Sequence, residues 1–417
     1  MYKVDNFING EASLVSSESS SIVNPSYGTV IGEVLYATKD SANAAVESAY
    51  EASKAWAKTG LSFRAELILK FRQGIINRSS EIVDICISEA GKTRPDAEAE
   101  LDRAVQALTH AAGVQHFFPT NYSQNVAGGI DIADLRFPIG VVAGVGPFNF
   151  PILIPILHSA MALVTGNTYI AKPSEKVPSI SRLYADIWKE AGLPDGCYNV
   201  INGEKEIVEL LVRHEKVDGL AFIGSTAAAK SLKMLGVEHN TKVQALGGGK
   251  NHMIVLPDAD LDMSADAAVS ASFGAAGQRC MAVSVVVAVG DIADDLISKI
   301  KARMPDLVMG VTDDEKTQLG PVISQANKDR IYSFIDSAEP DGASLVVDGR
   351  HRSNLLEGCF VGPTLIDNVK PGMSVYENEI FGPVLCFVRA KTYDEAMQIT
   401  HSHQLGNGAA LFTRDGG

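Results

Sequence analysis

The sequence is short of cysteine, of basic residues and of long apolar runs, and each shortage excludes a class of protein. Its five cysteines are an odd number and lack the paired or metal-ligand spacing that disulfide scaffolds and metal centres need. We therefore expect reduced thiols, no disulfide and no bound metal. The five are Cys86, Cys197, Cys280, Cys359 and Cys386.

Charge and targeting signals exclude further classes. Lysine and arginine number 36 against 50 aspartate and glutamate, which gives a net charge of −14. This balance argues against nucleic acid or an anionic membrane as the main partner, although a local basic site for an anionic ligand is compatible with it. The first residues form neither an apolar signal core nor an Arg-rich leader, and no apolar run is long enough to span a bilayer. These absences predict a cytoplasmic protein.

What is present is a large apolar fraction with clear periodicities. With 417 residues, 46% of them hydrophobic, the chain is long enough for two or three domains. Helical spacing dominates residues 40–115, and from residue 140 onward short apolar strands alternate with helices, which predicts an α/β fold with two doubly wound parallel sheets. The expected strands are 140–145, 168–171, 198–201, 219–223, 252–256, 284–289, 384–389 and 408–413, and the expected helices of this region are 152–165, 180–192, 206–214, 226–235, 262–276, 293–303 and 393–402.

Residues 277–282, Gly-Gln-Arg-Cys-Met-Ala, place Cys280 beside Arg279 just after an apolar helical stretch. A thiolate attacks carbonyl groups far better than a thiol does, and a neighbouring arginine or a helix end can lower a cysteine pKa. Cys280 is therefore a candidate nucleophile. The competing interpretation is an inert core cysteine, which is the commoner fate of a single cysteine.

Five further motifs decide between these interpretations. In chain order they are Gly-Val-Gly-Pro-Phe-Asn-Phe-Pro at 144–151, Ala-Lys-Pro-Ser-Glu at 171–175, Phe-Ile-Gly-Ser-Thr at 222–226, Gly-Gly-Lys-Asn-His at 248–252 and Glu-Ile-Phe-Gly-Pro at 379–383. Together with the cysteine motif, the chain resembles an aldehyde dehydrogenase from its first residues to its last. The Arg-Cys-Met-Ala and Lys-Asn-His motifs resemble those of the CoA-acylating, methylmalonate-semialdehyde dehydrogenase branch in particular.

The resemblance implies a domain plan. Residues 1–120 and 142–252 are expected to form a discontinuous NAD-binding domain, and residues 253–417 a catalytic domain that is C-terminally incomplete. Residues 121–141 are expected to form the protruding hairpin through which family members oligomerise, so a homo-oligomer, dimer or tetramer, is implied. The sequence stops at Gly417, where the family continues for several dozen residues. We expect either a fragment of a longer protein or a naturally shortened chain.

NAD binding rests on the resemblance, because Gly144 and Gly146 are followed by Pro147 and Phe148 and the spaced third glycine of a dinucleotide fingerprint is missing. Residues 224–231 have nearly the spacing of a phosphate-binding P-loop, but Ala229 stands where that loop needs its second glycine. The cofactor-binding residues that the resemblance implies are Gly146, Phe148, Lys172, Glu175, Lys176, Ser225, Gly247, Glu379 and Phe381.

Three of these assignments have plainer alternatives. Lys172 and Glu175 are expected to hold the hydroxyls of the adenosine ribose, but a solvated ion pair on a loop is an equal possibility. Phe381 is expected to pack near the nicotinamide ring, yet a single phenylalanine is more often part of a core. The first amides of the helix after Ser225 are expected to face the pyrophosphate.

The chemistry that the resemblance implies begins with addition of Cys280 to an aldehyde. The side chain of Asn149 and the backbone amide of Cys280 hold the oxyanion, and loss of a hydride leaves a thioester on Cys280. Hydrolytic members of the family carry a water-activating glutamate where this chain has Leu246. The missing base favours transfer to a thiol, which is already partly ionised near neutral pH, and CoA is the implied acceptor.

Substrate choice rests on Arg279 and Arg103, two guanidinium groups that suit a small anionic semialdehyde. Arg103 lies beside Glu100 and Asp102 in a helical pattern, so a solvated ion-pair partner is an equal possibility. A β-carboxylate on the thioester makes loss of carbon dioxide easy, because the resulting carbanion is an enolate. We expect methylmalonate or malonate semialdehyde to give propionyl-CoA or acetyl-CoA.

Two alternatives stay open. A hydrolytic NAD(P)-dependent aldehyde dehydrogenase would turn over on the nicotinamide cofactor alone, without CoA. A truncated, non-catalytic nucleotide-binding protein is the second alternative, because the missing C-terminal segment would finish the catalytic domain in the family.

Overall fold

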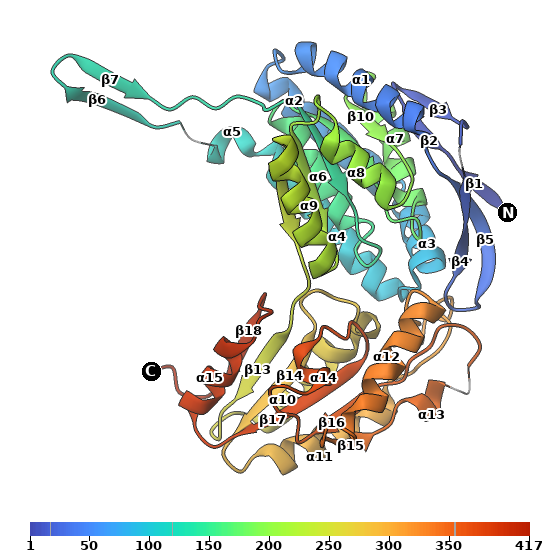
Figure 1. The fold of residues 1–417 in the computed structure, drawn as a ribbon, viewed down its shortest axis with the longest axis vertical. Coiled ribbons are helices and arrows are strands. Elements are labelled where there is room, and N and C mark those ends of the chain that lie inside the picture. Colours follow the sequence, from blue (N-terminus) through green and yellow to red (C-terminus); the bar gives the residue numbers. More distant parts are fainter. Residues whose placement is uncertain (17, 119, 354–355) are drawn as a thin grey trace. The chain divides into compact units, whose positions relative to one another are not determined.

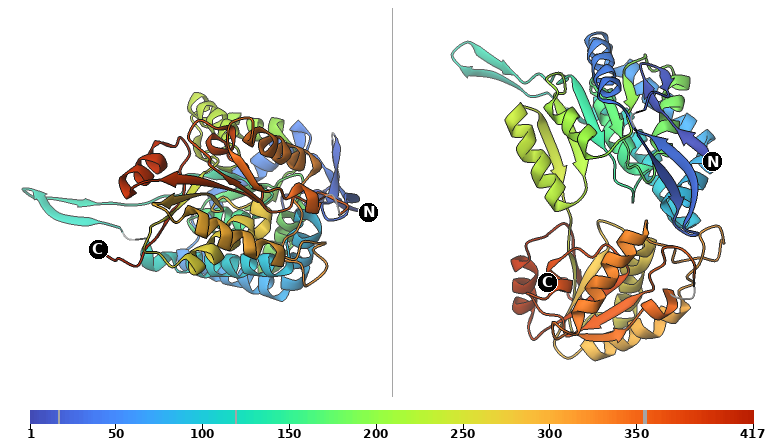
Figure 2. Two further views of the ribbon diagram at one scale, coloured as in Figure 1. Left: turned by 90° about the horizontal axis from the view of Figure 1, so that it is seen from below. Right: turned by 45° about the vertical axis from the view of Figure 1, so that its right-hand side comes forward.

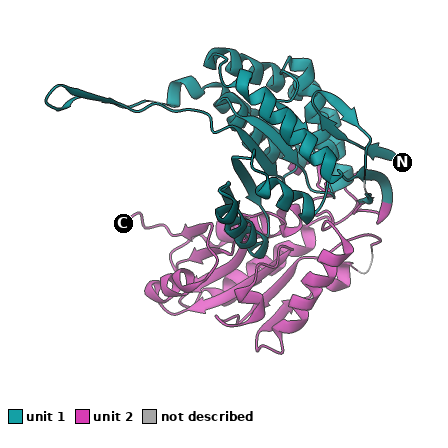
Figure 3. Ribbon diagram, turned by 45° about the horizontal axis from the view of Figure 1, so that its top comes forward, with its two compact units in different colours: residues 1–23, 30–89, 97–247 teal, residues 24–29, 90–96, 248–417 magenta. Residues whose placement is uncertain are grey.

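The computed structural model describes residues 1–16, 18–118, 120–353 and 356–417. The chain divides into two compact units (Figure 3). The first comprises residues 1–23, 30–89 and 97–247, and the second comprises residues 24–29, 90–96 and 248–417. Three short segments that the sequence analysis placed in the first domain, residues 24–29, 90–96 and 248–252, thus group with the second unit. For residues 24–29 hydrogen bonds explain this, since the Cys359 N–H donates to the Pro25 carbonyl at 2.9 Å and the Ser26 and Thr312 hydroxyls are hydrogen-bonded at 3.0 Å.

The helices expected between residues 40 and 115 are present as α1 (Lys39–Trp56), α2 (Leu61–Asn77), α3 (Ser79–Ala90) and α4 (Arg94–Ala112), and the short α5 (Val114–Phe117) follows. Helix α1 begins where the Thr38 hydroxyl accepts the Ser41 N–H at 3.0 Å, the usual N-cap. In α2 the apolar residues Leu67, Ile68, Phe71 and Ile75 recur at helical spacing and are buried, and Phe71 stacks on Trp188 with ring centroids 3.8 Å apart. Aromatic stacking of this kind adds about 1 kcal/mol to the burial itself.

The first unit is built on a seven-stranded sheet of order β12-β11-β8-β9-β10-β2-β3 (Figure 1). Its five parallel strands are β8 (Val141–Val145), β9 (Thr168–Lys172), β10 (Tyr198–Val200), β11 (Gly219–Ile223) and β12 (Lys242–Leu246), connected by α6 (Leu153–Val164), α7 (Ser179–Ala191), α8 (Lys205–Arg213) and α9 (Thr226–His239). The chain runs from β8 outward to β10 and then returns to place β11 on the other side of β8. The sheet is therefore doubly wound, and its strand order reverses between β8 and β11.

Strands at the start of the chain were not expected. β2 (Asn6–Ile8) and β3 (Glu11–Ser13) extend the first sheet in antiparallel fashion, and β1 (Tyr2–Val4), β4 (Ser19–Asn24) and β5 (Thr29–Leu35) form a separate three-stranded sheet. Most of these strands are only three residues long. Runs this short carry too few alternations to distinguish a strand from a loop.

The second unit is built on a six-stranded sheet of order β15-β16-β17-β14-β13-β18 (Figure 2). Its strands are β13 (Asn251–Val255), β14 (Val283–Val289), β15 (Ser344–Val347), β16 (Thr364–Asp367), β17 (Val384–Ala390) and β18 (Ala409–Phe412), all parallel except β15. The accompanying helices are α10 (Leu261–Phe273), η1 (Gly274–Gly277), α11 (Ala293–Arg303), η2 (Met304–Asp306), α12 (Gln325–Ala338), α13 (Arg350–Ser353), α14 (Ser374–Glu377) and α15 (Tyr393–Ser402).

Two apolar clusters form the core of this unit, one containing α10 and α11 and the other α12 and α15. Alternate residues of β14 enter different clusters, Val285 and Val287 one and Val286 and Ala288 the other. Strand β14 is therefore buried on both faces over residues 285–289, which form a continuous apolar run in the sequence.

The hairpin expected at residues 121–141 consists of β6 (Tyr122–Ala127) and β7 (Ile130–Ala133), and every residue of both strands is exposed. Figure 1 shows it extending from the first unit, to which it belongs. In the part of the chain that the structure describes, no helix is both long and apolar enough to cross a membrane.

Candidate active site

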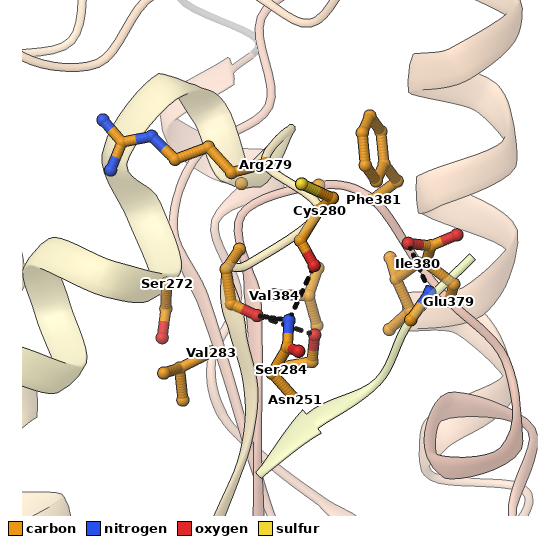
Figure 4. A pocket seen from close by; sticks show the side chains of 14 residues that line it. Asn251, Ser272, Arg279, Cys280, Val283, Ser284, Glu379, Ile380, Phe381 and Val384 are labelled. Atoms are coloured by element: carbon orange, nitrogen blue, oxygen red, sulfur yellow. Dashed lines mark hydrogen bonds between the residues drawn. The ribbon is translucent and has the colours of Figure 1, made fainter. Parts of the chain in front are cut away.

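A cavity in the second unit is lined by residues at the points where the chain enters three parallel strands (Figure 4). Cys280 and Ala282 precede β14, Asn251 is the first residue of β13, and residues 379–382 precede β17. Because parallel strands bring their amino ends to one edge of a sheet, three segments far apart in the sequence converge here.

The segment before Cys280 has an unusual backbone. Helix α10 ends at Phe273, and Ala275, Ala276 and Gly277 follow in left-handed conformations with φ of 50°, 52° and 69°. An alanine in this conformation costs about 1–2 kcal/mol. Gly277 also lies against other backbone, since a Cβ built on it would stand 2.2 Å from the Gly382 carbonyl oxygen. The turn therefore needs glycine at position 277 for two independent reasons.

Cys280 is exposed, whereas Cys86, Cys197, Cys359 and Cys386 are buried free thiols. Partial burial raises the pKa of the Cys280 thiol, Glu379 adds to that rise, and the backbone N–H groups of Cys280 and Met281 oppose it. The expected lowering of this pKa by Arg279 is wrong, because the pKa is raised and the guanidinium is paired with Asp96. Figure 4 shows its side chain directed away from Cys280.

Arg279 instead donates to the Asp96 carboxylate at 2.5 Å, and its guanidinium packs against Gly274. Arg103 lies in α4, exposed to solvent, and donates to Gln106 Oε1 at 3.0 Å. Glu100, considered above as an ion-pair partner of Arg103, is buried and accepts the N–H groups of Ile152 and Leu153, each at 2.8 Å. It thereby holds the start of α6 through the free amides of a helix N-terminus.

Glu379 and Phe381 both line the cavity that contains Cys280. Glu379 Oε1 accepts the Gly249 N–H at 3.1 Å, and burial raises the pKa of the Glu379 carboxyl. Phe381 is only partly buried and has a φ of 54°. Phe381 therefore lines a cavity from a strained backbone position, which differs from the alternative of a residue packed in the core.

The remaining predicted cofactor residues lie at one edge of the first sheet, where its parallel strands end. Gly146 and Phe148 follow β8, Lys172 ends β9 with Glu175 and Lys176 just after it, Ser225 follows β11, and Gly247 follows β12. This edge includes the point between β8 and β11 where the strand order reverses, which is where open α/β sheets bind ligands.

The same edge offers groups that fit a dinucleotide. Helix α9 begins at Thr226, its Ser225 cap accepts the Ala228 N–H at 3.3 Å, and the positive helix end suits a pyrophosphate. Because residues 226–231 are helical, the segment is not a P-loop. Lys172 is buried, its Nζ is 3.8 Å from Glu175, and burial lowers its pKa, so this pair is not a solvated pair on a loop.

Asn149 lies in the turn between β8 and α6 of the first unit and is 8% exposed. Leu246, at the position of the glutamate used by hydrolytic enzymes, ends β12 and is 49% exposed. Among the residues that the structure describes, no group of three or more histidine, cysteine or acidic side chains is arranged to hold a metal ion.

Sequence reasoning missed three residues that shape these sites. Glu100 caps α6, while Asn251 and Asn407 both donate to the Cys280 carbonyl oxygen, at 2.9 and 2.8 Å. Asn251 belongs to the Lys-Asn-His motif, which was recognised without a role for the asparagine. Asn407 has a φ of 114°, and the Gly-Asn-Gly at 406–408 was the one available signal, since it marks a turn.

Comparison with known proteins bears on the whole chain. A profile described as "Aldehyde dehydrogenase family" matches residues 14–417. The chain is 39% identical over 414 residues to malonate-semialdehyde dehydrogenase 1 of Geobacillus thermodenitrificans, a match covering 99% of this chain and 86% of the relative. It is 40% identical over 419 residues to malonate-semialdehyde dehydrogenase of Pseudomonas aeruginosa, covering 100% and 84%.

Solved structures give the same result for the fold. The crystal structure of methylmalonate-semialdehyde dehydrogenase from Oceanimonas doudoroffii superposes with a TM-score of 0.97 at 40% identity, covering 100% of this chain and 86% of that one. A Sinorhizobium meliloti 1021 protein in complex with NAD superposes with a TM-score of 0.96 at 41% identity and the same coverage. The predicted fold class is confirmed.

Proposed function

This chain belongs to the aldehyde dehydrogenase family, and from that premise we propose that it is an NAD-dependent, CoA-acylating dehydrogenase of malonate or methylmalonate semialdehyde. The observation that carries the proposal is the exposed Cys280 in a cavity that it shares with Glu379 and Phe381. The substrate is inferred from relatives about 40% identical that are named for these semialdehydes.

NAD is held, in this proposal, by the residues at the edge of the first sheet and by two residues of the second unit. Lys172, Glu175 and Lys176 receive the adenosine ribose, and Ser225 with the start of α9 receives the pyrophosphate. When bound, NAD supplies the oxidant that takes up a hydride from the substrate carbon. The other residues assigned to its binding are Gly146, Phe148, Gly247, Glu379 and Phe381.

The nucleophile is the thiolate of Cys280. It adds to the aldehyde carbonyl and forms a thiohemiacetal whose oxyanion accepts the Cys280 backbone N–H and, as the family resemblance implies, the side-chain amide of Asn149. Removal of one such hydrogen-bond donor lowers the catalytic rate constant by about a hundredfold or more. Oxidation of the carbon leaves the acyl group on Cys280 as a thioester.

Release of the acyl group is proposed to use CoA. The position of the hydrolytic base is Leu246, which has no group that can accept a proton from water. A β-carboxylate leaves as carbon dioxide, the resulting enolate takes up a proton, and the CoA thiolate attacks the thioester carbonyl. The bond to the Cys280 sulfur then breaks, which regenerates the thiolate and releases acetyl-CoA or propionyl-CoA.

The test is NADH formation by the purified chain given NAD and malonate or methylmalonate semialdehyde, before and after addition of CoA. We expect one equivalent of NADH without CoA and sustained turnover with it, and neither from Cys280→Ala. Absence of NADH from a folded chain that binds NAD would favour the non-catalytic alternative.

A hydrolytic dehydrogenase is the second candidate, because the Glu379 carboxylate lines the same cavity as Cys280 and burial raises its pKa toward the range of a general base. Sustained turnover on NAD alone, lost in Glu379→Gln, would support hydrolysis. In the acylating mechanism Glu379→Gln weakens NAD binding but leaves the requirement for CoA unchanged.

A further inference from the structure

The carbonyl oxygen of Cys280 accepts two hydrogen bonds from side-chain amides. Asn251 Nδ2 donates to it at 2.9 Å and Asn407 Nδ2 at 2.8 Å. Asn251 Nδ2 also donates to the Ala282 carbonyl at 2.7 Å, and its Oδ1 accepts the Gly408 N–H at 2.8 Å. Asn251 thus connects the starts of β13, β14 and β18. Figure 4 shows its amide hydrogen-bonded to backbone carbonyls of the segment before β14, beside Cys280.

This carbonyl belongs to the same peptide unit as the N–H of Met281. That N–H and the N–H of Cys280 are the two backbone groups that lower the pKa of the Cys280 thiol. A peptide group whose oxygen accepts hydrogen bonds is polarised and becomes a better donor at its nitrogen, and chains of hydrogen bonds strengthen one another. Because the peptide is planar, fixing its oxygen also fixes the direction of its N–H.

We propose that Asn251 and Asn407 are positioning residues for the nucleophile, holding the peptide between Cys280 and Met281 so that its N–H points at the Cys280 sulfur. The proposal rests on the proposed function of Cys280. Neither asparagine touches the reacting atoms, and both act through this one peptide.

No charged side chain among the described residues of the cavity lining stabilises the Cys280 thiolate. Of the residues lining the cavity, Arg279 and Glu379 are the charged ones, and Arg279 is engaged with Asp96. Burial and Glu379 both disfavour the thiolate, and the two backbone N–H groups favour it. The geometry of a single peptide therefore has a direct effect on nucleophilicity.

The two asparagines differ in a way that makes the role testable. Asn251 is buried and satisfies three backbone groups, so its loss also removes hydrogen bonds within the fold. Asn407 is exposed, its amide donates to the Cys280 carbonyl, and its φ of 114° is one that glycine adopts without strain. Asn407→Gly removes the amide while keeping the backbone conformation.

The experiment measures the rate of Cys280 alkylation by iodoacetamide across a pH series in wild type, Asn407→Gly, Asn251→Ala and Asn199→Ala. Alkylation at limiting reagent reports Cys280, because the other four cysteines are buried. Asn199 is the matched control, a buried asparagine of β10 whose side chain bonds the backbone of Asn9 and Gly196.

We expect Asn407→Gly to slow alkylation near neutral pH by about fivefold, the value of one hydrogen bond, and to displace the pH–rate profile to higher pH. Asn251→Ala should displace it at least as far, and Asn199→Ala should leave it unchanged. A profile for Asn407→Gly that coincides with wild type would overturn the proposal, even if Asn251→Ala fails to fold. Alkylation needs no substrate, so a displaced profile in an enzyme that makes no NADH would sustain the positioning role and refute the proposed function.

Discussion

Replacement of Gly277 by alanine tests whether the turn before Cys280 is fixed by backbone contact. The added Cβ would stand 2.2 Å from the Gly382 carbonyl oxygen, 2.4 Å from its carbon and 2.8 Å from the Pro383 nitrogen. These are main-chain atoms of the segment entering β17, so no side-chain rotation can relieve the overlap. The residue must also keep a φ of 69°.

The expected loss of stability has two parts. The left-handed conformation costs alanine about 1–2 kcal/mol, and forced displacement of packed backbone costs about 1–3 kcal/mol. The second unit should therefore lose about 2–5 kcal/mol of unfolding free energy. Gly372→Ala is the matched control in the same unit, because Gly372 has a φ of 93° with nothing within 4 Å of an added Cβ, and it should lose only the first part.

The assay must report the second unit. Both tryptophans, Trp56 and Trp188, lie in the first unit, so their fluorescence follows the wrong part of the chain. Pulse labelling of the buried thiols of Cys359 and Cys386 during a urea titration reports the second unit directly. Equal losses in Gly277→Ala and Gly372→Ala would refute the reasoning, because the close approach to Gly382 would then contribute nothing.

Three further outcomes are expected. Burial raises the pKa of the Glu89 carboxyl to about 7, above its unfolded value. The free energy of unfolding of wild type relative to Glu89→Gln should therefore fall by roughly 3 kcal/mol as the pH rises from about 4.5 to about 7, and stay constant above about pH 7. A difference between the two proteins that does not change with pH in urea titrations would contradict this. Arg279→Met tests the substrate contact that the resemblance implies for Arg279 against its observed pairing with Asp96. A carboxylate contact should raise the KM for malonate semialdehyde about tenfold and leave that for propanal unchanged, since only the first carries a carboxylate. Equal changes in steady-state kinetics would exclude that contact and leave only the pairing with Asp96. The resemblance implies that the hairpin joins subunits, so Ile132→Asp, at an exposed position of β7, should lower the mass measured by light scattering. An unchanged mass would argue against that role.

The fold was largely predictable because the two parallel sheets consist of buried apolar strands separated by amphipathic helices. The strand expected at 284–289 is β14, Val283–Val289, and the helix expected at 293–303 is α11 with the same bounds. Strand β12 was missed because it lies at the edge of its sheet and alternates between exposed and half-buried residues, including Lys242 and Gln244. An edge strand shows a weaker apolar signal than a central one.

Three of the predicted site residues come together in the structure, whereas the directions of their neighbours' side chains were not predictable. Cys280, Glu379 and Phe381 line one cavity, as their motifs indicated. The proximity of Arg279 and Cys280 in sequence led to the wrong expectation for the thiol. Residues 279–282 form a turn in which the Ala282 N–H donates to the Arg279 carbonyl at 3.0 Å, and the Arg279 guanidinium pairs with Asp96, which no spacing rule connects to it.

Where Cys280 lies decides how its thiolate can be stabilised. Low-pKa cysteines often sit at the N-terminus of a helix, whose dipole acts over a whole turn. Cys280 instead precedes a strand, so only individual N–H groups reach its sulfur, and a hydrogen bond weakens steeply as its angle departs from linear. A nucleophile activated in this way requires a loop held within a fraction of an ångström. The left-handed residues Ala275 and Ala276 and the contact between Gly277 and Gly382 are consistent with that requirement, because such strain persists only where the surrounding fold over-determines it.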